Sequence, residues 1–205
     1  MTGTTRTTLR DLSGLDQTPA SLAASTVILV DYQNTYTRGA MELEGWEAAL
    51  DAAADLLARA RGAGATVIHV QHDGGAGSPY DLSTELGQIH PRVAPAPGEA
   101  VVTKTAPDSF VRTELGDLVA AAGHDDVVVA GFMTHMCVTF TAQGAFLRGL
   151  RPTVVADACA TRSLASAAGE APAAQLHRGA LATVADLYGV VVATADGLTG
   201  EAAAA

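Results

Sequence analysis

Six short runs of mainly apolar, β-branched residues constrain the fold of this chain more than any other feature. Most are apolar at consecutive positions, which is typical of strands buried on both faces of a parallel sheet. Stretches with small and apolar residues at three-to-four spacing separate them and predict helices. The chain therefore predicts a three-layer α/β/α fold with a central, mostly parallel, six-stranded sheet. The predicted strands are 26–30, 66–70, 101–104, 126–130, 153–156 and 190–193, and the helices are 47–63, 112–122, 137–148 and 173–187.

The 205 residues contain no internal repeat and no linker, so one domain is expected. We assign 25–196 to this domain, 1–24 to an N-terminal arm on the surface or on a neighbouring subunit, and 197–205 to a flexible tail. A long segment rich in glycine and proline, 71–100, is predicted to hold a short helix at 82–88. Its glycine-rich part before that helix predicts a flexible lid.

The amino-acid composition limits the classes of partner that this chain can bind. A formal net charge of −10 argues against nucleic acid and anionic membranes, which would repel such a surface, and favours a small-molecule partner. No stretch approaches eighteen consecutive apolar residues, and the first ten residues lack the apolar centre of a signal peptide. Two cysteines are too few for a disulfide framework. Together these features predict a cytoplasmic protein.

One of these cysteines, Cys137, follows a buried strand and stands at the start of a predicted helix. Unpaired N–H groups and the helix dipole at such a position favour the thiolate and can lower the thiol pKa. The same N–H groups could hold an oxyanion. The alternative is that Cys137 is a small buried hydrophobic residue, as is expected of Cys159.

Two charged residues join Cys137 at one edge of the predicted sheet. Asp31 and Lys104 each end a strand, and ligands of such folds bind outside the carboxyl ends of the strands. Singly, Asp31 could be a structural cap and Lys104 a surface charge. Together, an acid, an ammonium and a thiol supply the groups that a nucleophilic hydrolase needs.

Three segments resemble the isochorismatase-like cysteine hydrolases, which include nicotinamidase, N-carbamoylsarcosine amidase and ureidoacrylate amidase. They are Asp31-Tyr-Gln-Asn34, Lys104-Thr-Ala-Pro-Asp-Ser-Phe-Val-Arg-Thr113, and Gly131-Phe-Met-Thr-His-Met-Cys-Val138 with Thr141-Ala142. The resemblance runs from about Thr26 to about Thr194. It implies a Rossmann-like hydrolase fold and assembly as a homodimer or larger homo-oligomer.

The resemblance also implies a role for each motif residue. Cys137 corresponds to the nucleophile that forms a thioester, Asp31 to the general acid and base, and Lys104 to the residue that supports both. A cis peptide bond between Phe132 and Met133 is implied, aiming the N–H of Met133, with that of Cys137, at the oxyanion. No cofactor is implied.

Four further residues are candidates for binding the substrate. Tyr36 and Gln33 follow the first strand, Phe110 follows Lys104, and His135 lies beside the nucleophile. The two aromatic rings could equally fill the core, and His135 could face a subunit interface. The weakly charged loop between Gly74 and Tyr80 favours a small neutral or modestly polar substrate.

A metal site is not expected. Family members that bind a metal carry an Asp-x-His after the second strand, whereas this chain has His69-Val-Gln-His-Asp. His69 and His72 are three residues apart in a strand, which places them on opposite faces. The absence of Asp-x-His therefore weakens the case for nicotinamidase activity. His124 and His177 are expected to be ordinary surface residues.

The sequence thus predicts an enzyme, a cysteine hydrolase that cleaves a carbon–nitrogen bond of a small amide, ureido compound or lactam. Two alternatives stay open. One is isochorismatase-type vinyl-ether hydrolysis, which needs Asp31 but not the thiol. The other is a non-catalytic or redox-sensing binding protein on the same scaffold, for which Cys137 would have an ordinary thiol pKa.

Overall fold

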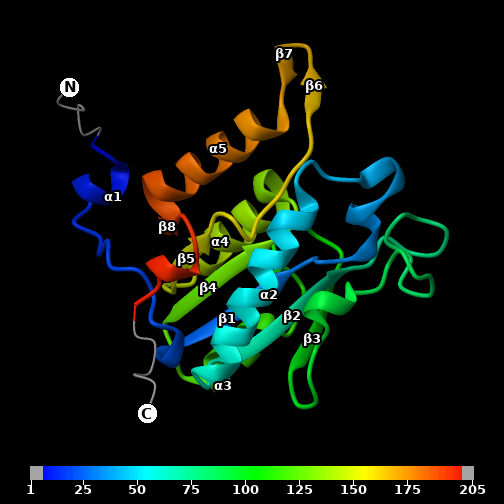
Figure 1. Ribbon diagram of the computed structural model, residues 1–205. Helices are drawn as coiled ribbons and strands as arrows, with labels where there is room; N and C mark the ends of the chain where they lie inside the picture. Colours follow the sequence, from blue (N-terminus) through cyan, green and yellow to red (C-terminus); the bar gives the residue numbers. More distant parts are fainter. Residues whose placement is uncertain (1–6, 200–205) are drawn as a thin grey trace.

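The computed structural model describes residues 7–199. Its centre is a six-stranded sheet in which every neighbouring pair is parallel, with the order β3-β2-β1-β4-β5-β8 (Figure 1). The strands are β1 (Ser25–Val30), β2 (Thr66–His72), β3 (Ala100–Lys104), β4 (Asp126–Gly131), β5 (Arg151–Val155) and β8 (Val190–Val192). The predicted fold class and all six predicted strands are confirmed.

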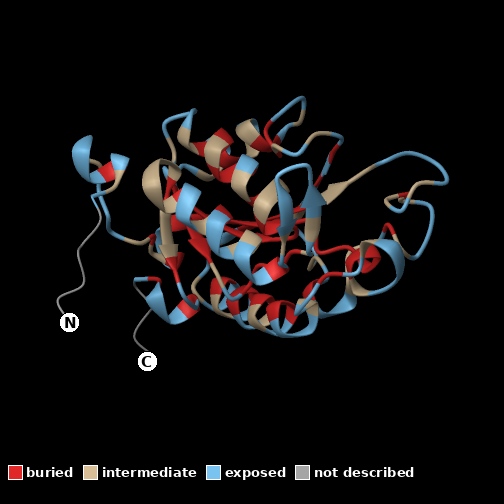
Figure 2. Cartoon of the chain, turned by 90° about the horizontal axis from the view of Figure 1, so that it is seen from above, coloured by how far each residue is buried: buried red, intermediate tan, exposed pale blue. Residues whose placement is uncertain are grey.

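Helices cover both faces of this sheet. Seen from above, the buried strands lie between layers of helices whose outer faces are exposed (Figure 2). The α-helices are α1 (Leu9–Leu12), α2 (Trp46–Gly62), α3 (Leu115–Ala122), α4 (Thr139–Phe146) and α5 (Ala173–Thr183). Helix α2 connects β1 to β2 and α4 connects β4 to β5, so right-handed crossovers in opposite directions place them on opposite faces. The direction in which the chain adds strands to the sheet therefore reverses between β1 and β4, and such folds bind ligands at this point.

The core consists mainly of the central strands. Every residue of β1 is buried, and β4 is buried from Val127 to Gly131. Helix α2 buries one stripe against this core, formed by Ala49, Leu50, Ala53, Leu56, Leu57 and Ala60. These are the six positions whose spacing predicts the helix, so hydrophobic periodicity located the packing face correctly.

The predicted short helix at 82–88 is wrong, because this segment forms turns. Asp81 accepts hydrogen bonds from the backbone N–H of Gly77 and of Ser83 and from the Ser83 hydroxyl. Side chains of this type offer the backbone an alternative to helical hydrogen bonds. Gly87 also packs so closely that a Cβ atom there would lie 2.2 Å from the Asp81 carbonyl oxygen.

Two helix boundaries also differ from prediction. Helix α3 begins at Leu115 rather than Arg112, because Arg112 has a left-handed backbone with φ 56°. The helix expected to begin at Cys137 begins earlier, with a π-helical turn (Thr134–Val138) that continues into α4. A second π-helical turn (Val184–Tyr188) follows α5. The chain also forms an antiparallel hairpin that the sequence did not suggest, β6 (Leu164–Ser166) with β7 (Gly169–Ala171).

The N-terminal segment from residue 7 follows the surface of its own chain. The N–H of Leu9 donates to Asp186 at 3.0 Å, and the buried Arg10 donates to the carbonyl oxygen of Leu187 at 3.1 Å. Ala20 N–H then donates to the Thr153 hydroxyl on β5 at 2.9 Å. The first six residues of the predicted arm, and the predicted flexible tail from residue 200, lie outside the described residues.

Candidate active site

The first candidate site residue, Asp31, comes directly after β1 with a left-handed backbone, φ 53°. Its N–H donates to the carbonyl oxygen of Val70 on β2 at 2.9 Å, so the turn is fixed to the neighbouring strand. The Asp31 side chain is completely buried. Within residues 7–199 the carboxylate forms an ion pair with Lys104 and faces the Cys137 thiol, and neither of its oxygens has a further hydrogen-bond partner. A buried carboxylate with free lone pairs is suited to accept a proton.

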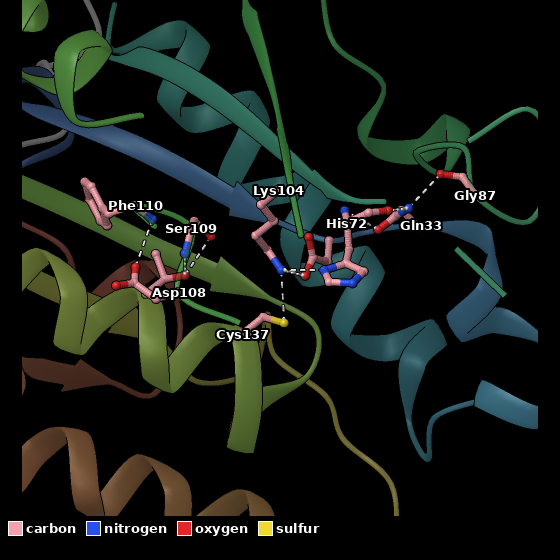
Figure 3. A network of polar contacts seen from close by, with 10 residues as sticks. Gln33, His72, Gly87, Lys104, Asp108, Ser109, Phe110 and Cys137 are labelled. Carbon is pink, nitrogen blue, oxygen red and sulfur yellow. Dashed lines mark hydrogen bonds and ion pairs between the residues drawn. The ribbon is translucent and has the colours of Figure 1, made fainter. Parts of the chain in front are cut away.

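The second residue, Lys104, ends β3 and has a fully buried side chain. Its Nζ lies 2.6 Å from Asp31 Oδ2 and 3.2 Å from Cys137 Sγ. Figure 3 shows the ammonium between the sulfur and the ring of His72, whose Nδ1 is 3.3 Å away. The acid, the ammonium and the thiol predicted from separate strands therefore meet at one edge of the sheet.

The third residue, Cys137, lies in the π-helical turn that follows β4. The strand ends at Gly131, where φ is 154° and a Cβ atom would lie 2.1 Å from the Val30 carbonyl oxygen. The next peptide bond, between Phe132 and Met133, is cis, as the resemblance implied. The N–H of Met133 has no hydrogen-bond partner in the part of the chain that the structure describes. An unpaired donor therefore lies close to the nucleophile in the chain.

Burial controls the protonation of this cluster. Burial raises the pKa of Asp31, and the ammonium of Lys104 opposes part of the rise. Burial, then the negative charge of Asp31, raises the pKa of the Cys137 thiol to about 12. Burial alone would lower the pKa of Lys104, but Asp31 and Cys137 raise it. The expectation that the helix start lowers the thiol pKa is therefore wrong, because burial and the charge of Asp31 both raise it.

Aromatic rings form a wall beside the triad. Tyr36 is 1% exposed and packs edge-on against Phe132 and Tyr80, with ring centroids 5.7 Å away in both cases. Tyr80 comes from the glycine-rich loop and also packs edge-on on His72, at 5.0 Å. Burial, then the charge of Asp31, raises the pKa of Tyr36 well above its ordinary value, so this ring stays neutral. The wall is therefore uncharged next to the ion pair.

Three of the four predicted substrate contacts have other partners. Both N–H groups of the Gln33 side chain are used, donating to the carbonyl oxygens of His72 and Gly87. The Phe110 ring points away from Lys104 and Cys137 (Figure 3) and stacks under the Arg148 guanidinium, 4.7 Å from its centroid. His135 Nδ1 lies 2.5 Å from the Thr161 hydroxyl, and its side chain lines a groove beside α5. Tyr36 alone lies against the triad.

The two histidines considered for metal binding diverge, as the strand spacing predicted. His69 Nε2 lies 2.9 Å from Glu99, which Arg61 also holds, whereas His72 faces Lys104. Among residues 7–199 no three His, Cys, Asp or Glu side chains are grouped closely enough to hold a metal ion.

Sequence reasoning missed two side chains beside the triad, His72 and Tyr80, and also Arg162, whose charge acts on Tyr80. The sequence suggests His72 only as a metal ligand and gives no reason to select Tyr80 or Arg162. His72 could have been found from its place at the end of β2, because it pairs in register with Lys104 at the end of β3. Arg162 follows β5 in an irregular segment, so no periodicity could have located it. His177, expected to be an ordinary surface residue, is half-buried and bonded to the Thr134 hydroxyl.

The isochorismatase domain model matches residues 25–196 of this chain. The chain belongs to the isochorismatase family. A crystal structure of an isochorismatase from Pseudomonas putida KT2440 superposes with a TM-score of 0.91 at 39% identity, covering 95% of this chain and 100% of that one. The N-carbamoylsarcosine amidase from Thermoplasma acidophilum shares the fold, with a TM-score of 0.71 at 23% identity over 86% of this chain and 99% of that one.

Two curated relatives of this chain have names that state a function. A secreted isochorismatase effector of Verticillium dahliae is 35% identical, covering 91% of this chain and 97% of that protein. Streptothricin hydrolase of Streptomyces noursei is 40% identical, and the aligned region covers 75% of this chain and 62% of that protein. This chain is therefore an isochorismatase-family hydrolase, as its motifs predicted.

The predicted cytoplasmic location stays a prediction, since one relative is named as secreted. Within residues 7–199, no helix combines the length and apolar character needed to cross a membrane.

Proposed function

We propose that this isochorismatase-family hydrolase cleaves the carbon–nitrogen bond of a small amide, ureido compound or lactam through a thioester on Cys137. The observation that supports it is the buried contact of Asp31, Lys104 and Cys137 at the carboxyl ends of three strands. A cation that touches both a carboxylate and a thiol can stabilise charge on either one while a proton moves between them.

In the first step, Cys137 Sγ attacks the carbonyl carbon while its proton passes to a carboxylate oxygen of Asp31. A thiol with a pKa of about 12 is ionised in only about one molecule in 10⁵ at pH 7, so attack requires this base. The oxyanion then faces the unpaired N–H of Met133, together with that of Cys137. This assignment keeps the role that the family resemblance implied for the cis peptide.

In the second step, protonated Asp31 returns its proton to the departing nitrogen, and the carbon–nitrogen bond breaks to leave a thioester and an amine. Asp31 then removes a proton from water, whose oxygen attacks the thioester carbon. Collapse of that intermediate releases the carboxylic acid and the thiolate, which Asp31 reprotonates. The free lone pairs of Asp31 suit this repeated transfer.

Arg162 favours a substrate that carries an anionic group. Its Nε atom is buried and has no hydrogen-bond partner within residues 7–199, and a buried donor of this kind is costly unless something binds it. Burial raises the pKa of Tyr80, and the charge of Arg162 opposes part of that rise, so the guanidinium lies near the aromatic wall. A substrate carboxylate would satisfy it. This revises the expectation of a neutral substrate.

The test is intact-mass spectrometry after exposure to a panel of small amides, ureido compounds and lactams. We expect an acyl adduct on the wild-type chain after an acid quench, absent from Cys137→Ala and strongly reduced in Asp31→Asn, because forming the thioester requires the base. Cys159→Ala is the matched control, because this second buried cysteine bonds the Val155 carbonyl oxygen and should leave the adduct unchanged. Turnover of a vinyl ether by Cys137→Ala would support the alternative hydrolysis and contradict the thioester. Complete inertness toward the panel would favour a binding protein.

The anion preference has its own test. Arg162→Gln should raise KM for a carboxylate-bearing amide by roughly 10- to 100-fold, because a charge-assisted hydrogen bond is lost, with little change for the uncharged ester analogue. Arg178→Gln, on the exposed side of α5, is the control. Equal effects on both substrates would contradict the assignment.

Assembly as a homodimer or larger homo-oligomer also stays part of the proposal. The exposed apolar side chains of Phe140 and Leu147, which lie on and just after α4, support it. Light scattering after size exclusion measures the assembly directly, and a monomer at micromolar concentration would contradict it.

A further inference from the structure

The ammonium of Lys104 has three N–H groups and three partners. Besides Asp31 Oδ2 at 2.6 Å and Cys137 Sγ at 3.2 Å, its Nζ lies 3.3 Å from His72 Nδ1 (Figure 3). The first two partners exchange protons in the proposed reaction. The imidazole is the one partner that takes no part in that exchange.

Three contacts hold His72 in this position. It is paired in register with Lys104 across β2 and β3, so the two side chains leave the sheet next to one another. Gln33 binds both backbone groups of His72, accepting from its N–H and donating to its carbonyl oxygen, each at 2.9 Å. Tyr80 packs on the ring at 5.0 Å. The imidazole is therefore fixed before a substrate arrives.

We propose that His72 is a positioning residue, a neutral imidazole protonated at Nε2 whose Nδ1 accepts one N–H of the Lys104 ammonium. Lys104 cannot accept a hydrogen bond, so a contact between Nζ and Nδ1 requires an unprotonated Nδ1. With one N–H held by His72, the ammonium has a single N–H left for each of Asp31 and Cys137. One oxygen of Asp31 thus stays free to take the thiol proton.

Removing this acceptor has a definite consequence. The Lys104 side chain is fully buried, so an N–H released from His72 has no water to bind and turns toward Asp31. A carboxylate that accepts two N–H groups is a weaker base. The proposed thiol activation would then slow while substrate binding stays the same.

The charges around His72 favour its neutral form. Burial lowers the pKa of His72, and the positive charge of Lys104 lowers it further, whereas Asp31 and Asp73 raise it. Tyr80, the other ionisable group against the ring, is itself kept neutral because burial raises its pKa. Protonation of His72 in acid would place two cations 3.3 Å apart and break the contact.

The first test needs no substrate, so it is independent of the proposed function on which the kinetic role rests. Nitrogen-15 NMR of the imidazole in the full chain should show Nε2 protonated and Nδ1 unprotonated at pH 7. Replacing the donor, as Lys104→Met, should raise the pKa of His72. A ring protonated at Nδ1, or a pKa that does not move, would overturn the inference.

The second test uses whichever substrate the amide panel reveals. His72→Leu should lower kcat by roughly 10- to 100-fold with little change in KM, as expected for a lost hydrogen bond to a charged group. His72→Asn places an oxygen near the position of Nδ1 and should recover most of that loss. His124→Asn is the control, because His124 lies just before β4, at the opposite end of the strands from His72. Equal losses in the leucine and asparagine variants, or a change confined to KM, would contradict a positioning role.

Discussion

Replacing Asp31 by asparagine should separate thiol reactivity from turnover, because this carboxylate both raises the thiol pKa and accepts the thiol proton. Lys104 Nζ touches Asp31 Oδ2 at 2.6 Å and Cys137 Sγ at 3.2 Å, so the two atoms lie within about 6 Å of one another. At an effective dielectric constant of about 20, removing a charge at that distance is worth about 3 kcal/mol, or about 100-fold in thiolate population. Lower nucleophilicity reduces the gain in alkylation rate to roughly tenfold.

The assay compares iodoacetamide alkylation of Cys137, followed by mass spectrometry at pH 8, with hydrolysis of a substrate. Asp31→Asn should alkylate roughly tenfold faster while turnover falls about 10²- to 10⁴-fold through loss of the general base. Asp157→Asn, an exposed carboxylate at the end of a neighbouring strand, should change neither. Unchanged or slower alkylation would refute the electrostatic reasoning, because it would mean that the charge of Asp31 does not raise the thiol pKa.

Three further predictions concern stability. Lys104→Met leaves the Asp31 charge buried without its cation, and should lower the free energy of unfolding by about 3 to 5 kcal/mol in urea titrations at pH 8; no loss would contradict a charged pair. Gly131→Ala should cost more than about 3 kcal/mol, because its Cβ would lie 2.1 Å from a carbonyl oxygen, whereas Gly62→Ala has open space and should be tolerated. Hydrogen bonds, the strongest of them from Arg61, lower the pKa of Glu99 from 4.5 to about 2. The contribution of ionised Glu99 to the free energy of unfolding is therefore complete above pH 4.5 and is lost as the pH falls through 2. Glu99→Gln should flatten that part of the stability curve, and an unchanged curve would exclude this source.

The strands and the triad could be predicted from the sequence because both depend on which residues follow one another along the chain. Consecutive apolar β-branched residues have few uses other than a doubly covered strand, and the six runs became the six strands of the sheet. Parallel strands bring their carboxyl ends to one edge, which is why Asp31, Lys104 and Cys137 could be expected together. The Phe132–Met133 bond was expected only through the family motif.

Side-chain partners and protonation depended on the tertiary structure. Gln33 looked available to a substrate, but the fold brings His72 and Gly87 to its amide. The predicted helix at 82–88 was lost to turns that Asp81 stabilises.

The sequence by itself determined the layers, the strand ends and the chemical groups at them, because these follow from hydrophobic periodicity along a continuous chain. Only the tertiary structure decided how those groups are charged and held. Burial depends on everything packed around an atom, and it raised the pKa of Cys137 where the local helix pattern had predicted a decrease. Strand pairing in the sheet placed His72 against Lys104, because β2 and β3 are far apart in sequence but adjacent in the sheet.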